Sequence, residues 1–446
     1  MILPSYSLLL FCIGAFFSSI QVFAVADQSF PAALNTTTSL LSNVNDSSLS
    51  VSADFDTYPK VFTRMHSLRN RYVIVFADDA DLKSIASHFS WLESQTSFSG
   101  HQFRQRVFKK FTGSLIKGYS GTFLRRFVFE IAKRPEIAYV ENEVVFRPVE
   151  VQYNAPYNLA RLAHRETLTN ETSSVYGYDA DPGLGVTVYT LDTGIIVEHE
   201  EFVGRATMVN LVRVSFDTDI VGHGTHVAGT AAGTTYGVAK NSSIVAVKVL
   251  NDRGSGSTSD ILSGLEYVAD QHTSNGGPSV INMSLGGSFS TALNQAVRNA
   301  VNQGIHVVVA AGNSGTDACS SSPASEPSVL TVGASDSNDN VASFSNIGSC
   351  VDVFAPGVNV LSAWNSDDDA SRQLSGTSMA SPLVAGLTAY LSAKDPSASV
   401  SDIQQQIKDL ATTGMLKGIP TNPAGTPDSI AFNGYTFSSE SSDDLS

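Results

Sequence analysis

The sequence predicts an α/β fold, a doubly wound and mainly parallel sheet preceded by a small α+β unit. After residue 180, five runs are nearly continuous in apolar and β-branched residues, which is typical of parallel strands covered on both faces. These runs are 186–191, 244–250, 280–285, 305–311 and 329–332. Helical periodicity lies between them, at 225–232, 258–272 and 291–303. This alternation indicates βαβ units, so we expect functional side chains at the carboxyl ends of the strands.

A second, shorter pattern precedes the α/β region. We expect a strand at 72–76, helices at 81–92 and 123–132, and strand again from 138 through 146. Together they predict a small α+β unit within residues 69–150. Pro148 and Pro156 flank the junction that follows, which favours a domain boundary there. The larger α/β domain then extends over residues 151–437.

The two ends of the chain differ from both units. An apolar run at 8–17, followed by small residues up to position 26, predicts a secretory signal peptide over residues 1–26, although a basic N-terminal region is missing. A buried strand or an anchor is the alternative. The run is too short to span a membrane and no later stretch replaces it, so we expect no membrane span. Residues 27–68, of low complexity, and the tail 438–446 are expected to be disordered.

The cysteines point to an oxidising compartment. Cys12 lies in the signal peptide, which leaves Cys319 and Cys350 in a chain expected to mature along the secretory route. We predict a disulfide between them, and two buried free thiols are the alternative. Neither cysteine has the spacing of a metal site. Glycosylation sequons begin at Asn35, Asn45, Asn170 and Asn241.

The charge is distributed unevenly along the chain. Residues 1–150 carry 15 Lys and Arg against 13 Asp and Glu, whereas residues 151–446 carry 12 against 29. An acidic domain of this kind excludes nucleic acid as a natural partner. The basic small unit could attract the acidic domain of the same chain, and a solvated basic face is the alternative.

Ser378 is the first candidate for chemistry. It follows the turn at Gly376 and precedes a nearly all-apolar helical run at 383–391, and we place Pro382 in the first turn of that helix. A helix N-terminus directs unpaired N–H groups toward whatever lies beside the serine hydroxyl. The pattern favours a nucleophile, although an ordinary N-cap on a core helix would look the same.

Three further polar residues lie where the architecture predicts a site. Asp192 follows the first strand, His223 stands between glycines before a helix, and Asn313 follows a later strand. Singly, they could be a cap, a loop residue and a turn residue. Together with Ser378 they fit acyl transfer: His223 as general base, Asp192 orienting it, and Asn313 with the Ser378 N–H stabilising the oxyanion. His226 could form a metal pair with His223, but no glutamate follows His223, which argues against a zinc motif.

In this order, the four motifs resemble those of the subtilisin-like serine proteases of the proteinase K group, closest to the fungal vacuolar cerevisin type, over about residues 69–435. The resemblance implies a serine endopeptidase of broad specificity with an apolar lean, acting on proteins and peptides as a monomer. It also implies edge strands that pair with the substrate and small residues lining its S1 pocket. These substrate-binding residues are Gly254, Ser255, Gly256, Ser284, Leu285, Gly286, Ala310, Ala311 and Gly312.

By the same resemblance, residues 69–150 are a ferredoxin-like propeptide that inhibits the enzyme and assists its folding. Autocatalytic removal near Glu150 would release the mature domain into the vacuole or the extracellular space. The resemblance further implies a structural calcium ion held by the carbonyls of Pro327 and Val329 and by Asp352, and it supports the pairing of Cys319 with Cys350.

The chain also departs from the usual pattern of this group. Val227 replaces a cysteine beside the candidate histidine, and Leu383 replaces a histidine after Pro382, where we expect altered packing and retained activity. Met415 stands where a second calcium carboxylate occurs. The alternatives to a protease are a catalytically silent relative that acts as a binding module, and a serine esterase.

Overall fold

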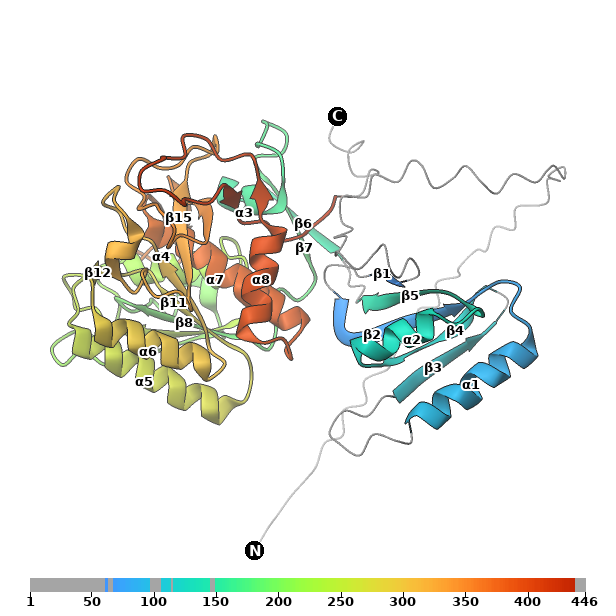
Figure 1. Ribbon diagram of the computed structural model, residues 1–446. Coiled ribbons are helices and arrows are strands. Elements are labelled where there is room, and N and C mark those ends of the chain that lie inside the picture. Colours follow the sequence, from blue (N-terminus) through green and yellow to red (C-terminus); the bar gives the residue numbers. More distant parts are fainter. Residues whose placement is uncertain (1–60, 63–66, 97–105, 114, 145–148, 438–446) are drawn as a thin grey trace, which may run out of the picture.

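The computed structural model describes residues 61–62, 67–96, 106–113, 115–144 and 149–437. The predicted signal peptide, most of the segment 27–68, the sequons at Asn35 and Asn45, and the tail 438–446 lie outside the described residues. Figure 1 shows an N-terminal α+β unit and a larger α/β unit.

The N-terminal unit has the predicted α+β fold. Its elements are β1 (Val61–Phe62), β2 (Ser67–Phe76), α1 (Leu82–Thr96), β3 (Arg106–Thr112), β4 (Lys117–Thr122), α2 (Arg125–Ala132) and β5 (Ile137–Val144). The sheet order is β1-β5-β2-β4-β3, and the pairs among β2 to β5 are antiparallel, which is the ferredoxin-like arrangement. The sequence pattern does not predict β3 and β4. Strand β3 lies at the sheet edge with mostly exposed side chains, and β4 has the sequence KGYSGT, so neither shows an apolar pattern.

A nine-stranded sheet forms the centre of the larger unit, in the order β19-β20-β16-β15-β13-β11-β8-β10-β9. All of its pairs are parallel except β19 with β20, which confirms the predicted mainly parallel sheet. The strands are β8 (Thr187–Asp192), β9 (Ala206–Asn210), β10 (Ser243–Lys248), β11 (Ser279–Met283), β13 (His306–Ala310), β15 (Leu330–Ser335), β16 (Val353–Pro356), β19 (Thr412–Thr413) and β20 (Ser429–Ile430).

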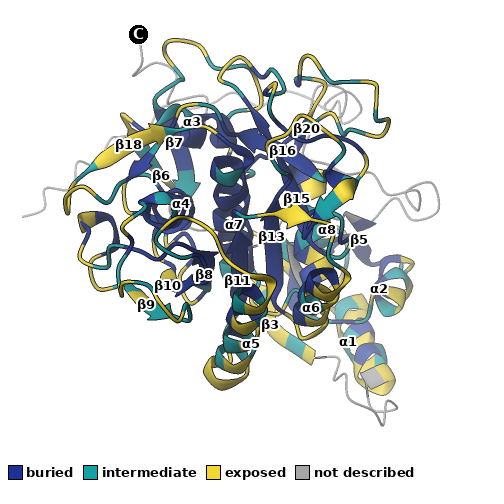
Figure 2. Cartoon of the chain, turned by 90° about the vertical axis from the view of Figure 1, so that its left-hand side faces the viewer, coloured by how far each residue is buried: buried dark blue, intermediate teal, exposed yellow. Residues whose placement is uncertain are grey.

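Helices cover both faces of this sheet because side chains alternate along its strands. Val188 of β8 belongs to a core that includes α4 (His223–Ala232), α7 (Thr377–Lys394) and α8 (Val400–Leu410). Its neighbour Tyr189 belongs to a second core with α5 (Thr258–Asn275) and α6 (Thr291–Asn302). Figure 2 shows α7 as a buried helix in the middle of the unit. The predicted alternation of strands and helices is thus confirmed.

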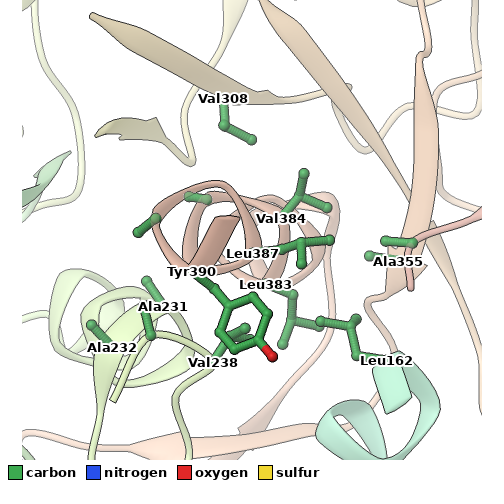
Figure 3. Close-up of a cluster of buried hydrophobic side chains, with 14 of the residues drawn as sticks. Leu162, Ala231, Ala232, Val238, Val308, Ala355, Leu383, Val384, Leu387 and Tyr390 are labelled. Carbon is green, nitrogen blue, oxygen red and sulfur yellow. The ribbon is translucent and has the colours of Figure 1, made fainter. Parts of the chain in front are cut away.

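Helix α7 differs from its prediction in one respect. It begins at Thr377, so Pro382 lies in the second turn and not in the first. Leu383 is fully buried against Leu162 and the other core residues around α7 (Figure 3). The residue that departs from the family pattern therefore packs as a core side chain, as expected.

Shorter elements complete the larger unit. They are β6 (Val149–Tyr153), α3 (Tyr157–Ala163), β7 (Val175–Asp179), β12 (Gly287–Ser288), β14 (Ser321–Ser322), β17 (Val360–Ala363), β18 (Ser371–Leu374) and the single turns η1 (Glu200–Phe202) and η2 (Ala318–Ser320). Strand β6 pairs antiparallel with β7, and it contains Glu150 and Val151. The predicted maturation cut therefore lies within a paired strand of the intact chain.

Two further predictions can be compared with the structure. Cys319 and Cys350 form a disulfide with a Cα–Cα distance of 5.3 Å, so the free-thiol alternative is wrong. Among the described residues, no helix is both long and apolar enough to cross a membrane.

Candidate active site

The candidate acid–base pair joins the end of a strand to the start of a helix. Asp192 is the last residue of β8 and is fully buried, and His223 is the first residue of α4. His223 Nδ1 lies 2.7 Å from Asp192 Oδ1. With a carboxylate as acceptor, Nδ1 carries the proton and Nε2 is left as the basic nitrogen. Burial lowers the pKa of His223, but the charge and hydrogen bond of Asp192, with a contribution from Asp219, raise it above the ordinary value.

A glycine allows His223 to start α4 where it does. Gly222 has a φ of 89°, and a Cβ there would lie 2.7 Å from the indole ring of Trp364. A left-handed conformation with no room for a side chain requires glycine. The glycines around the candidate histidine therefore have a structural role of their own.

Two buried residues that the sequence analysis does not identify support this pair. Asp219 accepts hydrogen bonds from the Gly222 and Thr225 N–H groups at 2.9 and 2.8 Å, and from Thr193 Oγ1 at 2.8 Å. It thereby caps α4 and ties it to the residue after Asp192. Lys248 is fully buried, and its Nζ donates to the Thr193 carbonyl at 2.6 Å. The only signal in the sequence is an aspartate four residues before His223.

Ser378 is the second residue of α7 and is half-buried. Its Oγ donates to the Ser284 carbonyl at 3.2 Å and not to His223. Ser284 directly follows β11, and both Ser284 and His223 line one cleft. A serine hydroxyl that donates to a carbonyl would have to turn away from it to give its proton to a base, and such catalytic bonds are often unformed in the absence of substrate.

Ser284 also supports the backbone beneath the candidate nucleophile. Pro382 has no N–H to donate to the Ser378 carbonyl four residues earlier, and Ser284 Oγ donates to that carbonyl at 2.8 Å. Asn282 Nδ2 in turn donates to Ser284 Oγ at 3.0 Å, and Ser381 Oγ donates to Asn282 Oδ1 at 2.7 Å. Ser284 is predicted from the sequence to bind substrate, and this contact with the Ser378 carbonyl is not predicted.

Asn313 binds the start of α7 through its side-chain oxygen. Its Oδ1 accepts from the Thr377 N–H at 2.8 Å and from Thr377 Oγ1 at 2.9 Å. A Cβ placed on Gly376 would lie 3.4 Å from Asn313 Nδ2 and 3.6 Å from the Ser378 nitrogen. Both nitrogen atoms therefore lie close to one point beside Gly376, next to Ser378.

The adjoining cleft has a volume of about 800 Å³. The predicted residues Gly254 to Gly256 and Ser284 to Gly286 line it, with His223. These two segments lie outside the named strands, so the expected edge strands are irregular stretches in the structure. Apolar side chains also line the cleft: Leu250, Ile261, Leu285, Phe289 and Leu293.

The predicted S1 residues are not part of this cleft lining. Ala310 and Ala311 are buried and Gly312 is half-buried, and the Gly312 N–H donates to Thr377 Oγ1 at 3.1 Å. Asn346 Nδ2 donates to the Ala311 carbonyl at 2.9 Å. These contacts place the three residues beside the start of α7, and their role in an S1 pocket stays a prediction.

His226 has a structural role. Its Nε2 lies 3.0 Å from the carbonyls of both Val360 and Arg372, which belong to β17 and β18. Burial lowers its pKa to about 4, so the ring is neutral and donates across this hairpin. The engagement of Nε2 with carbonyls argues against the metal pair with His223.

The residues at the expected calcium site do not fit that ion. Asp352 Oδ1 accepts from Lys408 Nζ at 2.6 Å, and Oδ2 accepts from the Thr331 N–H at 2.8 Å. Calcium binds oxygen atoms whose lone pairs face the ion. The expected set also includes Pro327 and Val329, so Asp352 is its only carboxylate. Both oxygens of this carboxylate face N–H donors instead of an ion. Met415, at the place of a second calcium carboxylate, packs against the core.

Comparison with known proteins agrees with this geometry. The model of the subtilase family, Peptidase S8, matches residues 183–428, and that of peptidase inhibitor I9 matches residues 71–148. The chain therefore belongs to the subtilase family, and it is a serine endopeptidase with an inhibitor-type propeptide.

Several fungal proteins and one solved structure are similar over most of their length. The subtilase-type proteinase psp3 of Schizosaccharomyces pombe is 43% identical over 384 residues, covering 83% of each chain. Alkaline protease 1 of Emericella nidulans is 41% identical over 381 residues, covering 82% of this chain and 91% of that protein. The crystal structure of a cold-adapted subtilisin-like serine proteinase matches with a TM-score of 0.59 and 42% identity, covering 64% of this chain and 100% of that one.

Proposed function

We propose that this subtilase hydrolyses peptide bonds with Ser378 as nucleophile, His223 as general base and Asp192 as its orienting partner. The observation that carries the proposal is the 2.7 Å contact between His223 and the buried Asp192. His223 lines the cleft together with Ser284, and the Ser284 carbonyl accepts a hydrogen bond from Ser378 Oγ. A serine hydroxyl is a weak nucleophile unless an adjacent base accepts its proton.

The reaction follows from these positions. Ser378 Oγ attacks the substrate carbonyl carbon while His223 Nε2 takes the hydroxyl proton, and Asp192 stabilises the imidazolium. Asn313 Nδ2 and the Ser378 N–H donate to the oxyanion. His223 then protonates the leaving amine, which departs as the C–N bond breaks and leaves an acyl group on Ser378. A water molecule then attacks the acyl carbon while His223 takes its proton. The bond from this carbon to Ser378 Oγ breaks, His223 returns the proton to that oxygen, and the acid is released.

We further propose a broad specificity with a preference for apolar side chains. Supporting this are the apolar residues of the cleft, Leu250, Ile261, Leu285, Phe289 and Leu293, which remove apolar substrate groups from water. The backbone of the irregular segments around Ser255 and Leu285 would pair with an extended substrate.

We propose that the enzyme is made as a zymogen and removes its own propeptide near Glu150. The I9 match supports residues 69–150 as the inhibitor. Strand β6 would have to separate from β7 before the bond at Glu150 could enter any active site, so self-cleavage competes with this pairing. The predicted signal peptide supports delivery to the vacuole or the extracellular space, where we expect the mature enzyme to act as a monomer. A calcium ion at Asp352 is not part of this proposal.

The proposal is tested with a fluorophosphonate probe, which reacts with activated serines. We expect the mature protein to be labelled and to degrade casein, and the Ser378→Ala chain to be unlabelled and to retain its propeptide. Absence of labelling in the unmodified protein would support the catalytically silent alternative. Labelling and ester hydrolysis without casein degradation would support the esterase.

A further inference from the structure

Two carboxylates lie beside the loop that precedes β15, and each has a cation of its own. Glu326 accepts from Arg298 of α6, with contacts of 3.0 Å from Nε and 2.5 Å from Nη2. Asp352 accepts from Lys408 of α8 at 2.6 Å. The negative charges of this region are therefore balanced one to one by the side chains of the protein.

Helix α8 holds this arrangement in place. Gln404 and Lys408 are one turn apart on the helix, and Gln404 Nε2 donates to the Ser328 carbonyl at 2.9 Å. The buried side chains Ile403 and Ile407 fix an adjacent side of the helix to the core, and a capping box at Ser399 begins it. One rigid helix thus presents an amide and an ammonium to the loop carbonyl and to the carboxylate.

We infer that the Lys408 ammonium takes the place of a structural divalent cation in this subtilase. An ammonium is a compact charge with three donors, and it can neutralise a carboxylate where an ion would otherwise be needed. A calcium ion at Asp352 would lie next to Lys408, and two neighbouring cations repel each other. The loop around Ser328 is joined to the neighbouring helix by the chain itself and needs no metal.

With the Lys408 ammonium in place of a calcium ion, the local structure depends on an ion pair and not on a bound metal. The side chain of Lys408 is 41% exposed and that of Asp352 is 21% exposed, so the pair is screened by solvent and by salt. Its contribution to stability is modest, but it does not vary with the calcium concentration. We expect this part of the fold to persist in the presence of a chelator.

The test measures the thermal midpoint of unfolding of the full chain, with Ser378→Ala in every variant to prevent self-digestion. Lys408→Ala removes the ammonium, Asp352→Asn removes the carboxylate, and Lys417→Ala is the matched control, because its Nζ bonds only a backbone carbonyl, that of Asn338, at 3.0 Å. Each is heated in EDTA and in millimolar calcium chloride.

We expect Lys408→Ala to unfold about 2 to 4 °C lower in EDTA than the parent and to recover at least in part with calcium, because the carboxylate becomes free to bind it. Asp352→Asn should be destabilised with no such recovery. If calcium raises the thermal midpoint equally in the parent, Lys417→Ala and Asp352→Asn, the ion binds at another site, and this outcome agrees with the inference. A calcium response in the parent that Asp352→Asn abolishes would overturn it, as would Lys408→Ala behaving like Lys417→Ala.

Discussion

At the scale of single residues, we expect the environment of His223, the proposed general base, to determine the pH range of activity. Its Nδ1 is held by the buried Asp192, and the two carboxylates near it keep its pKa above the ordinary value despite burial. The general base must be neutral at Nε2 to accept the Ser378 proton. Activity is therefore expected to rise with pH through the raised pKa of His223.

Replacing Asp192 by Asn tests this relation. Removing the carboxylate charge lowers the pKa of His223, so the acidic limb of the profile of kcat/KM against pH should move to lower pH. The loss of the correct tautomer should reduce kcat by about 10⁴-fold. The measurement is the pH profile on a peptide substrate. An unchanged acidic limb would mean that another group controls it.

At the scale of elements, the start of α7 depends on a donor from a neighbouring strand end. Pro382 cannot donate to the Ser378 carbonyl, and Ser284 does so from the end of β11. The Ser378 carbonyl, which receives no helical N–H because of Pro382, thus couples α7 to the cleft through Ser284. The sequence displays Pro382 and Ser284 but not their relation, because 94 residues separate Ser284 from Ser378.

Ser284→Ala should destabilise the fold by about 1 kcal/mol, because the Ser378 carbonyl loses its donor. In a Pro382→Ala background, the restored helical N–H should take over this role, and the cost of Ser284→Ala should shrink. Urea unfolding of the four chains, all with Ser378→Ala, measures the coupling as a double-mutant cycle. Equal costs in the two backgrounds would contradict the proposed relation.

At the scale of the whole molecule, the parallel sheet brings the carboxyl ends of β8, β11 and β13 next to one another. Asp192, Ser284 and Asn313 lie at or just beyond these ends, and α4 and α7 bring His223 and Ser378 to the same region. Since α7 is buried along most of its length, Ser378, the proposed nucleophile, is carried by one of the most protected elements of the fold.

The disulfide contributes to the stability of the same unit. It joins η2 to the segment before β16, across a sequence separation of 31 residues. Replacing Cys319 and Cys350 together by Ser should lower the free energy of unfolding by about 3 to 4 kcal/mol, since the unfolded chain gains freedom. Denaturant unfolding of the Ser378→Ala chain, with and without the two replacements, measures the change. A loss below about 1 kcal/mol would show that this loop is restrained without the disulfide.

The sequence is sufficient to predict the fold class, the candidate residues Asp192, His223, Asn313 and Ser378, and a disulfide between Cys319 and Cys350 with free thiols as the alternative. These predictions depend on local patterns: apolar β-branched runs, and glycines around the candidate residues. The disulfide depends on the oxidising compartment that a signal peptide implies. Strand β3 could not be predicted from the sequence, because an exposed edge strand has no apolar pattern.

The partners of these residues follow from how the elements pack in three dimensions. Asp219 binds the start of α4 and Thr193, and Lys248 binds the Thr193 carbonyl from the end of the neighbouring strand. Ser284 contacts Ser378 where the end of β11 meets α7, and Lys408 contacts Asp352 because α8 packs beside it. The resemblance to known proteases places a carboxylate where similar proteins hold calcium, but it does not predict the ammonium that faces this carboxylate from 56 positions away in the chain. Such pairs depend on how elements pack, because local sequence does not encode the distance between residues far apart in the chain.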